Sequence, residues 1–107
     1  MSDKVKAELD RIVEALVETG IVSKIILFGS HARGDATPDS DIDLCVLTSE
    51  EDRHPIDLMQ FFRRKLWGVK KMPLDLLAYN QDHFYNSAER SSSFEHEVVK
   101  DGVLIYG

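Results

Sequence analysis

The spacing of apolar residues along this chain changes period several times, and this alternation restricts the fold more than any other feature. After Ser2 the apolar residues recur every three or four positions, at Val5, Leu9, Ile12 and Leu16, with Val13 and Val17 beside them. This spacing predicts an amphipathic helix that begins at Ser2 or Asp3 and ends near Gly20. The next apolar run, residues 24–28, is short and leads directly into Gly29, which predicts a buried strand.

The rest of the chain continues this alternation. Turn-forming residues between positions 30 and 40 leave room for a short helix from Ser30 to about Gly34. The later predicted elements are a strand at 41–47, a helix after Pro55 that carries Ile56, Met59, Phe62, Leu66 and Val69, a strand at 74–79, a partly helical stretch at 81–101 and a short strand at 103–106. The pattern indicates one α/β (α+β) domain over residues 1–107. Because the link between the first two strands is short, those strands are able to pair antiparallel.

Charge and composition restrict the possible binding partners of the protein and its possible cellular location. The net charge of −6 argues against direct nucleic-acid binding, because such binding needs clustered Lys and Arg. No segment approaches the roughly 20 apolar residues of a membrane span, so no membrane association is expected. The polar start of the chain predicts no signal peptide, and the lone Cys45, in an apolar run, is predicted to be a buried structural thiol. Together these features predict a cytoplasmic protein.

Asp41 and Asp43 are the first candidates for chemistry. Residues at i and i+2 of a strand project from the same face, so the two carboxylates are aimed at one point. Like charges this close raise each other's pKa unless a cation lies between them. Mg²⁺ takes oxygen ligands and commonly binds one or two carboxylates together with substrate phosphates. The pair therefore predicts a Mg²⁺ site; the plainer interpretation is a solvated, idle pair at a strand end.

Asp75 is the third candidate, inside the apolar stretch 73–77 that is predicted to be a buried strand. A buried carboxylate is costly unless it is paired, hydrogen-bonded or bound to a metal. If this strand lies beside the one at 41–47, all three acids share one site. Such a cluster serves a displacement with two metal ions, one at the leaving pyrophosphate and one at the attacking hydroxyl. Asp75 is then a metal ligand, a base for the hydroxyl, or both; the plainer interpretation is a satisfied core carboxylate.

The residues after the first strand are suited to a phosphate. Gly29 lets the backbone come close to a phosphate, and the N-terminus of a following helix favours an anion. The hydroxyl of Ser30 adds a hydrogen bond, and Arg33, one turn later, is placed to pair with the same triphosphate. Taken singly, Gly-Ser is a common turn, Ser40 a turn or cap residue and Arg33 a surface residue. The prediction of a nucleotide site depends on their combination with the acids.

Gly29-Ser30, ten intervening residues and Asp41-Ile42-Asp43 together resemble the signature of the DNA polymerase β nucleotidyltransferase superfamily. The fuller string from Phe28 to Gly34, followed by Ser40 to Leu44, is similar to the minimal nucleotidyltransferases of bacteria and archaea. The resemblance covers most of the chain, including an acid in the third core strand at Asp75. It implies a nucleotidyltransferase fold with a small mixed sheet flanked by helices.

The same resemblance implies roles for the individual residues. The triphosphate of ATP is expected over Gly29 and Ser30, with Arg33 and Ser40 as further nucleotide-binding residues. The catalytic and Mg²⁺-binding residues implied by the family pattern are Asp41, Asp43 and Asp75.

Many minimal nucleotidyltransferases are antitoxins paired with a HEPN-domain ribonuclease toxin. The resemblance therefore implies transfer of AMP from ATP to a tyrosine of such a toxin, which silences it, and a hetero-oligomer of the two chains. The small size of the chain favours a protein acceptor, because larger nucleotidyltransferases carry extra domains that grip their acceptor. Two other functions stay open: a non-enzymatic antitoxin that masks the toxin sterically, and nucleotidyl transfer to a small molecule such as an aminoglycoside.

The predicted helix after Pro55 offers a candidate partner surface. Beside its core stripe it carries Leu58, Phe61 and Trp67, so more of its circumference is apolar than one face requires. The alternatives are a protein interface and, against it, a helix buried on two sides or a crowded core. The basic residues 63–65 and 70–71 are interpreted as a solvated face, with docking of an acidic partner or of RNA as the alternative.

Overall fold

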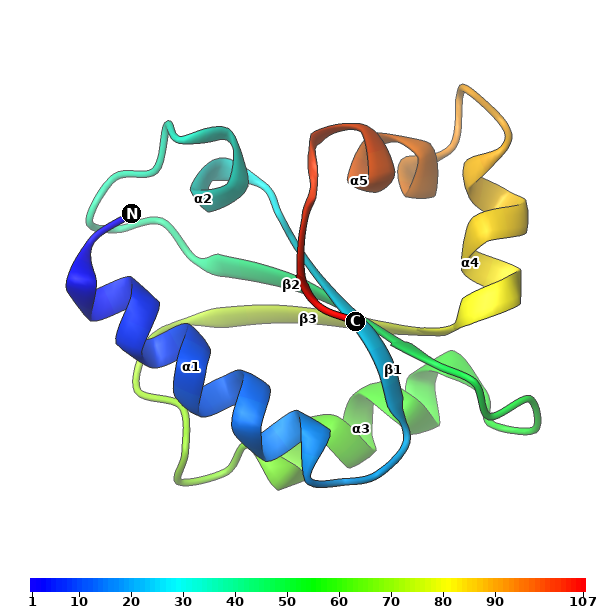
Figure 1. The fold of residues 1–107 in the computed structure, drawn as a ribbon, viewed down its shortest axis with the longest axis horizontal. Helices are drawn as coiled ribbons and strands as arrows, with labels where there is room; N and C mark the ends of the chain where they lie inside the picture. Colours follow the sequence, from blue (N-terminus) through cyan, green and yellow to red (C-terminus); the bar gives the residue numbers. More distant parts are fainter.

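The computed structural model of residues 1–107 has one four-stranded sheet and five helices (Figure 1). Along the chain the elements are α1 (Asp3–Val17), β1 (Val22–Phe28), α2 (Ser30–Arg33), β2 (Ile42–Thr48), α3 (Pro55–Lys65), β3 (Leu74–Asn80), α4 (Gln81–Ala88), α5 (Phe94–Asp101) and β4 (Val103–Tyr106). This order confirms the predicted alternation, including the short helix at Ser30 and the terminal strand. The stretch predicted to be partly helical forms two helices, α4 and α5.

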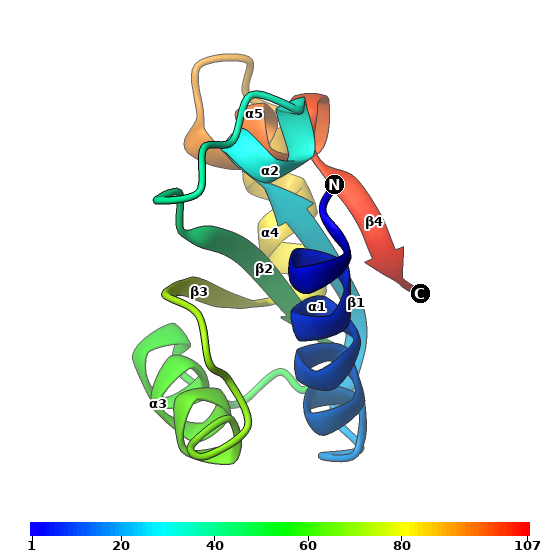
Figure 2. The same ribbon diagram turned by 90° about the vertical axis from the view of Figure 1, so that its left-hand side faces the viewer.

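The strands lie in the order β3-β2-β1-β4, and the sheet is mixed, as the resemblance implies. β1 pairs antiparallel with both β2 and β4, whereas β2 and β3 are parallel, with α3 as the crossover between them. The edge strands β3 and β4 lie on opposite sides of the sheet in Figure 2. The register places Phe28, Asp43 and Asp75 in one row across β1, β2 and β3.

Different helices cover the two faces of the sheet (Figure 1). α1 and α3 pack on one face, where 14 buried residues form the larger core cluster. α4 and α5 cover part of the other face, where five buried residues form a smaller cluster: Ile26, Cys45, Leu47, Phe84 and Val98. Because side chains alternate along a strand, Asp43 and Asp75 project from this second face, which the smaller cluster fills only in part.

α1 begins where the sequence predicts, and its apolar stripe is buried. The Ser2 hydroxyl accepts a hydrogen bond from the N–H of Val5 at 3.2 Å and caps the helix. Glu8 lies on the same face as Val5 and Ile12 and has no exposed surface. The apolar pattern did not predict a buried charge there, although the spacing of three from Val5 and four to Ile12 indicates the position.

α3 buries only part of the predicted stripe: Phe62 and Leu66 are in the core, but Leu58 is buried in place of Ile56. Leu58 and Phe62 are fully buried, whereas 53% of the surface of Ile56 is exposed. His54 caps the helix and Pro55 is its first residue, so Ile56 lies in the first turn and faces away from the core. Leu58 therefore belongs to the core and not to a partner surface. Phe61 packs against the larger cluster, and only Trp67, beyond the end of the helix, stays exposed, at 89%.

Cys45 is free and buried, as predicted. Burial raises the pKa of its thiol to about 12, and the charge of Glu95 adds to the rise. The thiol is therefore protonated at neutral pH and does not act as a nucleophile. None of the helices has both the length and the apolar content that crossing a membrane would require.

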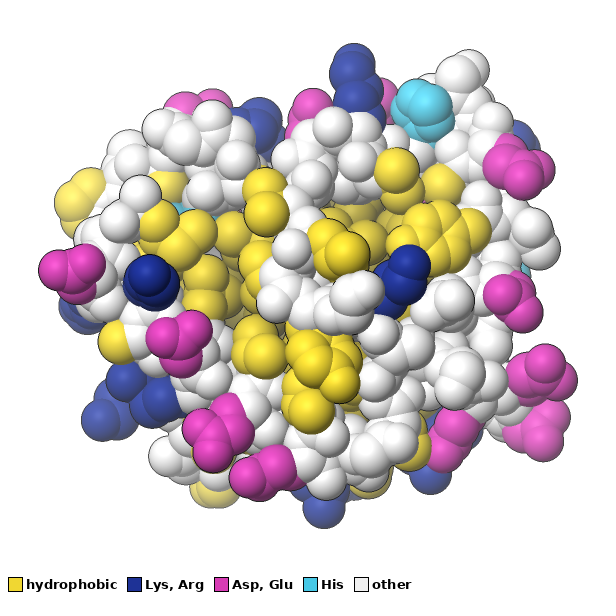
Figure 3. Space-filling model, viewed as in Figure 1, with side chains coloured by type: hydrophobic (Ala, Val, Ile, Leu, Met, Phe, Trp, Pro, Cys, Tyr) yellow, Lys and Arg dark blue, Asp and Glu magenta, His cyan; other side chains and the backbone are white.

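An apolar groove of about 490 Å³ lies between α1 and β4, and its apolar walls include Leu9, Val13, Val17, Ile105 and Tyr106. Beside it, Leu104 exposes 51% of its surface and Val103 exposes 46%. We call these seven residues the β4 surface. Figure 3 shows apolar side chains gathered near the centre of this view, over β4 and α1, with acidic residues around the rim.

Candidate active site

The candidate site begins at the turn after β1. Gly29 has φ 74° and ψ −156°, a combination that only glycine adopts readily. A Cβ atom at this position would collide with the carboxylate of Asp43, so the turn packs directly against that side chain. α2 starts at Ser30, and no side chain caps it, which leaves its first N–H groups open to an anion such as a phosphate.

β2 and β3 bring two of the three predicted acids side by side. In the parallel pairing Asp43 is level with Asp75, and Phe28 of β1 is level with Asp43 on the other side. Residues level on adjacent strands project from the same face about 5 Å apart. Asp41 lies two residues before Asp43, just outside β2, and its charge acts on Asp43. The three carboxylates therefore occupy the same end of the sheet.

Asp75 is exposed, so the expectation of a buried carboxylate is wrong. β3 is an edge strand, and its side chains alternate between two unequal faces. Leu76 and Ala78 point into the larger core and are 1% exposed, whereas Asp75 lies on the less covered face. The exposed carboxylate of Asp75 therefore has no desolvation cost to offset. What places Asp75 at the site is its register with Asp43.

Burial and neighbouring charges act on the half-buried carboxyl of Asp43. Desolvation raises the pKa of Asp43 above its ordinary value of 3.8, and the charges of Asp75 and Asp41 raise it further. His31 and Arg33 lower the same pKa but do not cancel the rise. A bound cation would relieve an excess of negative charge of this kind.

The donor set fits a hard divalent cation such as Mg²⁺, which takes carboxylate oxygens. Asp41, Asp43 and Asp75 would hold it, and the absence of a Cβ at Gly29 leaves room for the Asp43 carboxylate. The three carboxylates do not form a complete set of metal ligands in this conformation, because no group of three or more His, Cys, Asp or Glu side chains is arranged to hold a metal ion. The ligand roles of the three acids stay a prediction.

Arg33 lies beside the glycine turn. It lines a pocket of about 280 Å³ together with Phe28, Gly29, Phe94, Glu97, Val98 and Asp101. The guanidinium is exposed, and its Nε donates to the carboxylate of Asp35 at 3.3 Å. Surface ion pairs contribute little to stability, so Arg33 is able to exchange Asp35 for a phosphate at low cost.

Ser40 has a structural role in this conformation. Its hydroxyl accepts the N–H of Thr37 at 2.9 Å and closes the turn before β2, which is the plainer of the two interpretations of Ser40. His31, for which no role was predicted, has its Nε2 3.3 Å from the carbonyl oxygen of Ser40. This contact ties α2 to the residue before Asp41. The only sequence signal for His31 is its place in the turn between Gly29 and the acids.

Comparison with known proteins identifies the family. The family described as "Nucleotidyltransferase domain" matches residues 9–104. The chain therefore belongs to this family and is a nucleotidyltransferase, which confirms the resemblance seen in the sequence. A protein of Methanocaldococcus jannaschii named "Putative protein adenylyltransferase" is 33% identical over 87 residues, 81% of each chain.

A solved structure supports the same fold. The crystal structure of a "putative nucleotidyltransferase" from Sulfolobus solfataricus matches this structure with a TM-score of 0.62 at 20% identity. The match covers 97% of this chain and 86% of that one. The nucleotidyltransferase fold that the sequence resemblance implies is therefore confirmed.

Proposed function

We propose that this chain transfers AMP from ATP to a protein hydroxyl, in a reaction that depends on Mg²⁺. The observation that carries the proposal is the packing of Gly29 against Asp43, with Asp75 level with Asp43 on the next strand. The family supplies the reaction type, and the name of the Methanocaldococcus jannaschii relative supports an adenylyl donor and a protein acceptor.

Each residue has a defined part in the proposed reaction. The turn at Gly29 and Ser30 presents backbone N–H groups and a hydroxyl to the triphosphate, and Arg33 pairs with a phosphate. The three aspartates would hold the metal, and a bound metal would offset the negative charge of the triphosphate. Asp75 accepts the proton of the acceptor hydroxyl. The hydroxyl oxygen then bonds to the α-phosphorus, the bond to the β-phosphate breaks, and pyrophosphate leaves.

The acceptor in this proposal is a tyrosine of a HEPN-domain ribonuclease toxin, which the transferred AMP silences. The choice of this toxin class rests on the resemblance to minimal nucleotidyltransferases. The two chains form a hetero-oligomer in the cytoplasm, the compartment that suits a free, unpaired thiol such as Cys45. The net charge of −6 supports a protein partner over a nucleic acid.

Two surfaces support contact with a partner protein. The β4 surface is apolar and adjoins an unpaired strand edge, a combination that is typical of protein interfaces. The second surface is smaller: Arg63, Arg64 and Trp67 line a hollow of about 350 Å³ at the end of α3. Trp and Arg are the residues most enriched among those that dominate interface energies. Binding of the partner to the Leu104→Lys and Trp67→Ala variants separates the contributions of the two surfaces.

The transfer is tested with the product of the adjacent gene, ATP and Mg²⁺, and the neighbour is weighed by intact mass spectrometry. An adenylyl adduct is expected with the wild-type chain and not with the Asp43→Asn variant. No adduct, while the two chains still bind, would overturn the enzymatic proposal. An adduct on an added aminoglycoside and none on the protein would redirect it to a small-molecule acceptor.

Steric masking makes the opposite prediction for the same residues. Under masking, the double substitution Asp41→Asn, Asp43→Asn leaves neutralisation of toxin growth arrest unchanged. Under transfer, it abolishes neutralisation even when the complex still forms. Growth of cells that express the toxin with either antitoxin variant, together with co-purification of the two chains, separates these outcomes.

A further inference from the structure

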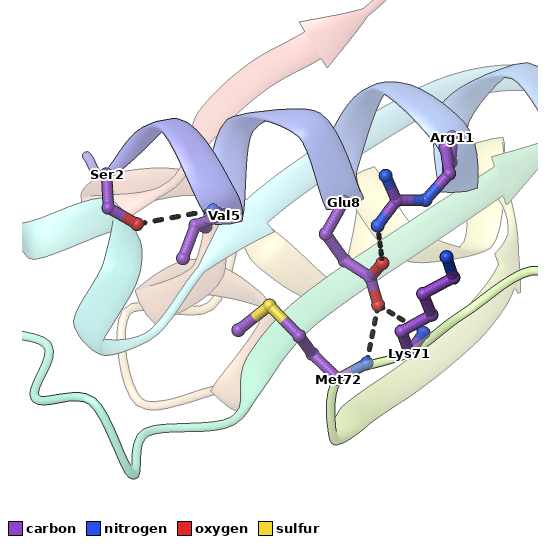
Figure 4. A network of polar contacts seen from close by, with 6 residues as sticks. All are labelled: Ser2, Val5, Glu8, Arg11, Lys71 and Met72. Carbon is purple, nitrogen blue, oxygen red and sulfur yellow. Dashed lines mark hydrogen bonds and ion pairs between the residues drawn. The ribbon is translucent and has the colours of Figure 1, made fainter.

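Glu8 is a buried charge that the reaction described above does not use. Of the 22 buried residues in the chain, only Glu8 and Thr48 are polar or charged, and Glu8 has no exposed surface. A carboxylate at such a position is retained only if strong hydrogen bonds offset its loss of hydration. Figure 4 shows the side chain of Glu8 pointing from α1 towards the segment that precedes β3.

The partners of Glu8 account for its burial. One carboxylate oxygen, Oε2, accepts the backbone N–H groups of both Lys71 and Met72 at 2.6 Å (Figure 4). The other oxygen, Oε1, accepts from the guanidinium of Arg11 at 2.5 Å, within the same helix. Burial raises the pKa of Glu8, but these hydrogen bonds outweigh it and hold the pKa below its ordinary value of 4.5. Glu8 is therefore ionised at neutral pH.

The residues that Glu8 holds lead directly to the candidate site. Pro73, the next residue, has no N–H, and its carbonyl oxygen accepts the N–H of Ile42 at 3.1 Å. The parallel pairing of β2 and β3 starts there, with Ile42 level with Leu74 and Asp43 level with Asp75. Glu8 thus contacts the chain three and four residues before Asp75.

β3 is an edge strand, which is where a further anchor has most effect. β3 pairs only with β2, so no second strand restrains it. A strand held on one side is free to slip or fray at its first residues, and Asp75 is the second residue of β3. The hydrogen bonds from Lys71 and Met72 to Glu8 tie the segment before β3 to α1.

We propose that Glu8 is a positioning residue, which fixes the segment before β3 and thereby keeps Asp75 level with Asp43 for metal binding. The inference deepens the proposed function, and rests on it, in that Asp75 is taken as a member of the metal-binding set. Glu8 itself touches neither metal nor substrate.

Two variants test whether the position of the Glu8 carboxylate oxygen that accepts from Lys71 and Met72 matters. Glu8→Asp keeps the charge but draws the carboxylate back by one methylene, and Glu8→Leu fills a similar volume without any acceptor. The matched control is Glu14→Asp, on an exposed residue of the same helix. The readouts are Mg²⁺ affinity by titration calorimetry, hydrogen exchange at the amides of residues 74–76, and the separate kcat and KM for ATP.

We expect both Glu8 variants to bind Mg²⁺ about 10-fold more weakly or worse, as is typical when the residues that support metal ligands are removed. Exchange at residues 74–76 should quicken, and kcat should fall while KM changes little. Glu14→Asp should match the wild type in every readout. A folded Glu8→Asp variant with wild-type Mg²⁺ affinity and exchange would overturn the inference, even if Glu8→Leu fails to fold.

An Asp75→Asn variant, measured in parallel, separates this inference from the proposed function. If Asp75→Asn weakens Mg²⁺ binding and the Glu8 variants do not, only the positioning role is overturned. If Asp75→Asn binds Mg²⁺ like the wild type, the metal-binding role of Asp75 fails, and the positioning role of Glu8 fails with it.

Discussion

Gly29 and Asp43 constrain each other, because the space that a side chain would need at position 29 is taken by the Asp43 carboxylate. The free energy of unfolding of the Gly29→Ala variant should therefore be lower by about 1–3 kcal/mol, because of backbone strain. It should also lose more than about 100-fold in kcat, because Asp43 must move. Urea unfolding and adenylyl transfer measure the two effects.

Gly34→Ala is the matched control for that substitution. Gly34 also has a positive φ, 85°, but a Cβ there meets no atom within 4 Å. A smaller loss of stability, with activity retained, is expected, because Gly34 is in the left-handed helical region and a Cβ there meets nothing. Equal loss of activity in both variants would show that strain, and not the collision with Asp43, is responsible.

The raised pKa of Asp43 predicts that its negative charge destabilises the folded chain at neutral pH when no cation is bound. Because the pKa is higher in the folded chain than the ordinary 3.8, the contribution of Asp43 is fully present below pH 3.8 and is lost as the pH rises through the folded pKa. In buffer with EDTA at pH 7, Asp43→Asn should therefore have a higher urea midpoint than the wild type. Added Mg²⁺ should stabilise the wild type and leave the variant unchanged.

That prediction is checked by urea unfolding at a series of pH values. The difference between Asp43→Asn and the wild type should narrow as the pH falls towards 3.8, the ordinary value for an aspartate. A variant less stable than the wild type at pH 7 without metal would contradict the sign of the effect.

At the scale of single elements, α3 shows that apolar spacing did not fully decide which side chains are buried: the core takes Phe62 and Leu66 of the predicted stripe together with Leu58. Leu58 is fully buried, whereas Ile56 is 53% exposed. Leu58→Ala should lower the free energy of unfolding by about 2–5 kcal/mol, through lost burial and the cavity that remains. Ile56→Ala should change it by less than about 0.5 kcal/mol. Similar losses for the two variants in urea unfolding would contradict this difference in burial between Leu58 and Ile56.

β3 shows that the composition of a strand does not report which of its faces are buried. Its apolar composition predicts burial on both faces, and Asp75 then looks like a buried charge. As an edge strand it has one well-covered face and one poorly covered face, so Asp75 is exposed. Strand order is set by long-range pairing, and local composition does not report it.

At the scale of the whole molecule, the two faces of the sheet are unequally stabilised. The face under α1 and α3 has 14 buried core residues, and the face under α4 and α5 has five. Amides of α4 and α5 should therefore exchange with solvent at a lower opening free energy than those of β1 and β2. Native-state hydrogen exchange tests this, and equal protection of α5 and β2 would contradict it.

The chain by itself determined the elements and most of the candidate site. Periodicity located the helices and strands, because side-chain spacing follows local geometry of 3.6 or two residues per repeat. The glycine turn and the pair Asp41 and Asp43 were readable because they are close in sequence. The combined motif also indicated the family, which the comparison confirmed.

Tertiary structure alone decided which segments meet and which faces they bury. In the tertiary structure Asp75 is level with Asp43, and Leu58 lies in the core. The Ser40 hydroxyl closes a turn. Glu8 is hydrogen-bonded to Lys71 and Met72, which are 63 and 64 residues away in the chain. These outcomes depend on strand order and on contacts between residues far apart in the chain. Neither periodicity nor composition carries that information, because both describe only neighbours along the sequence.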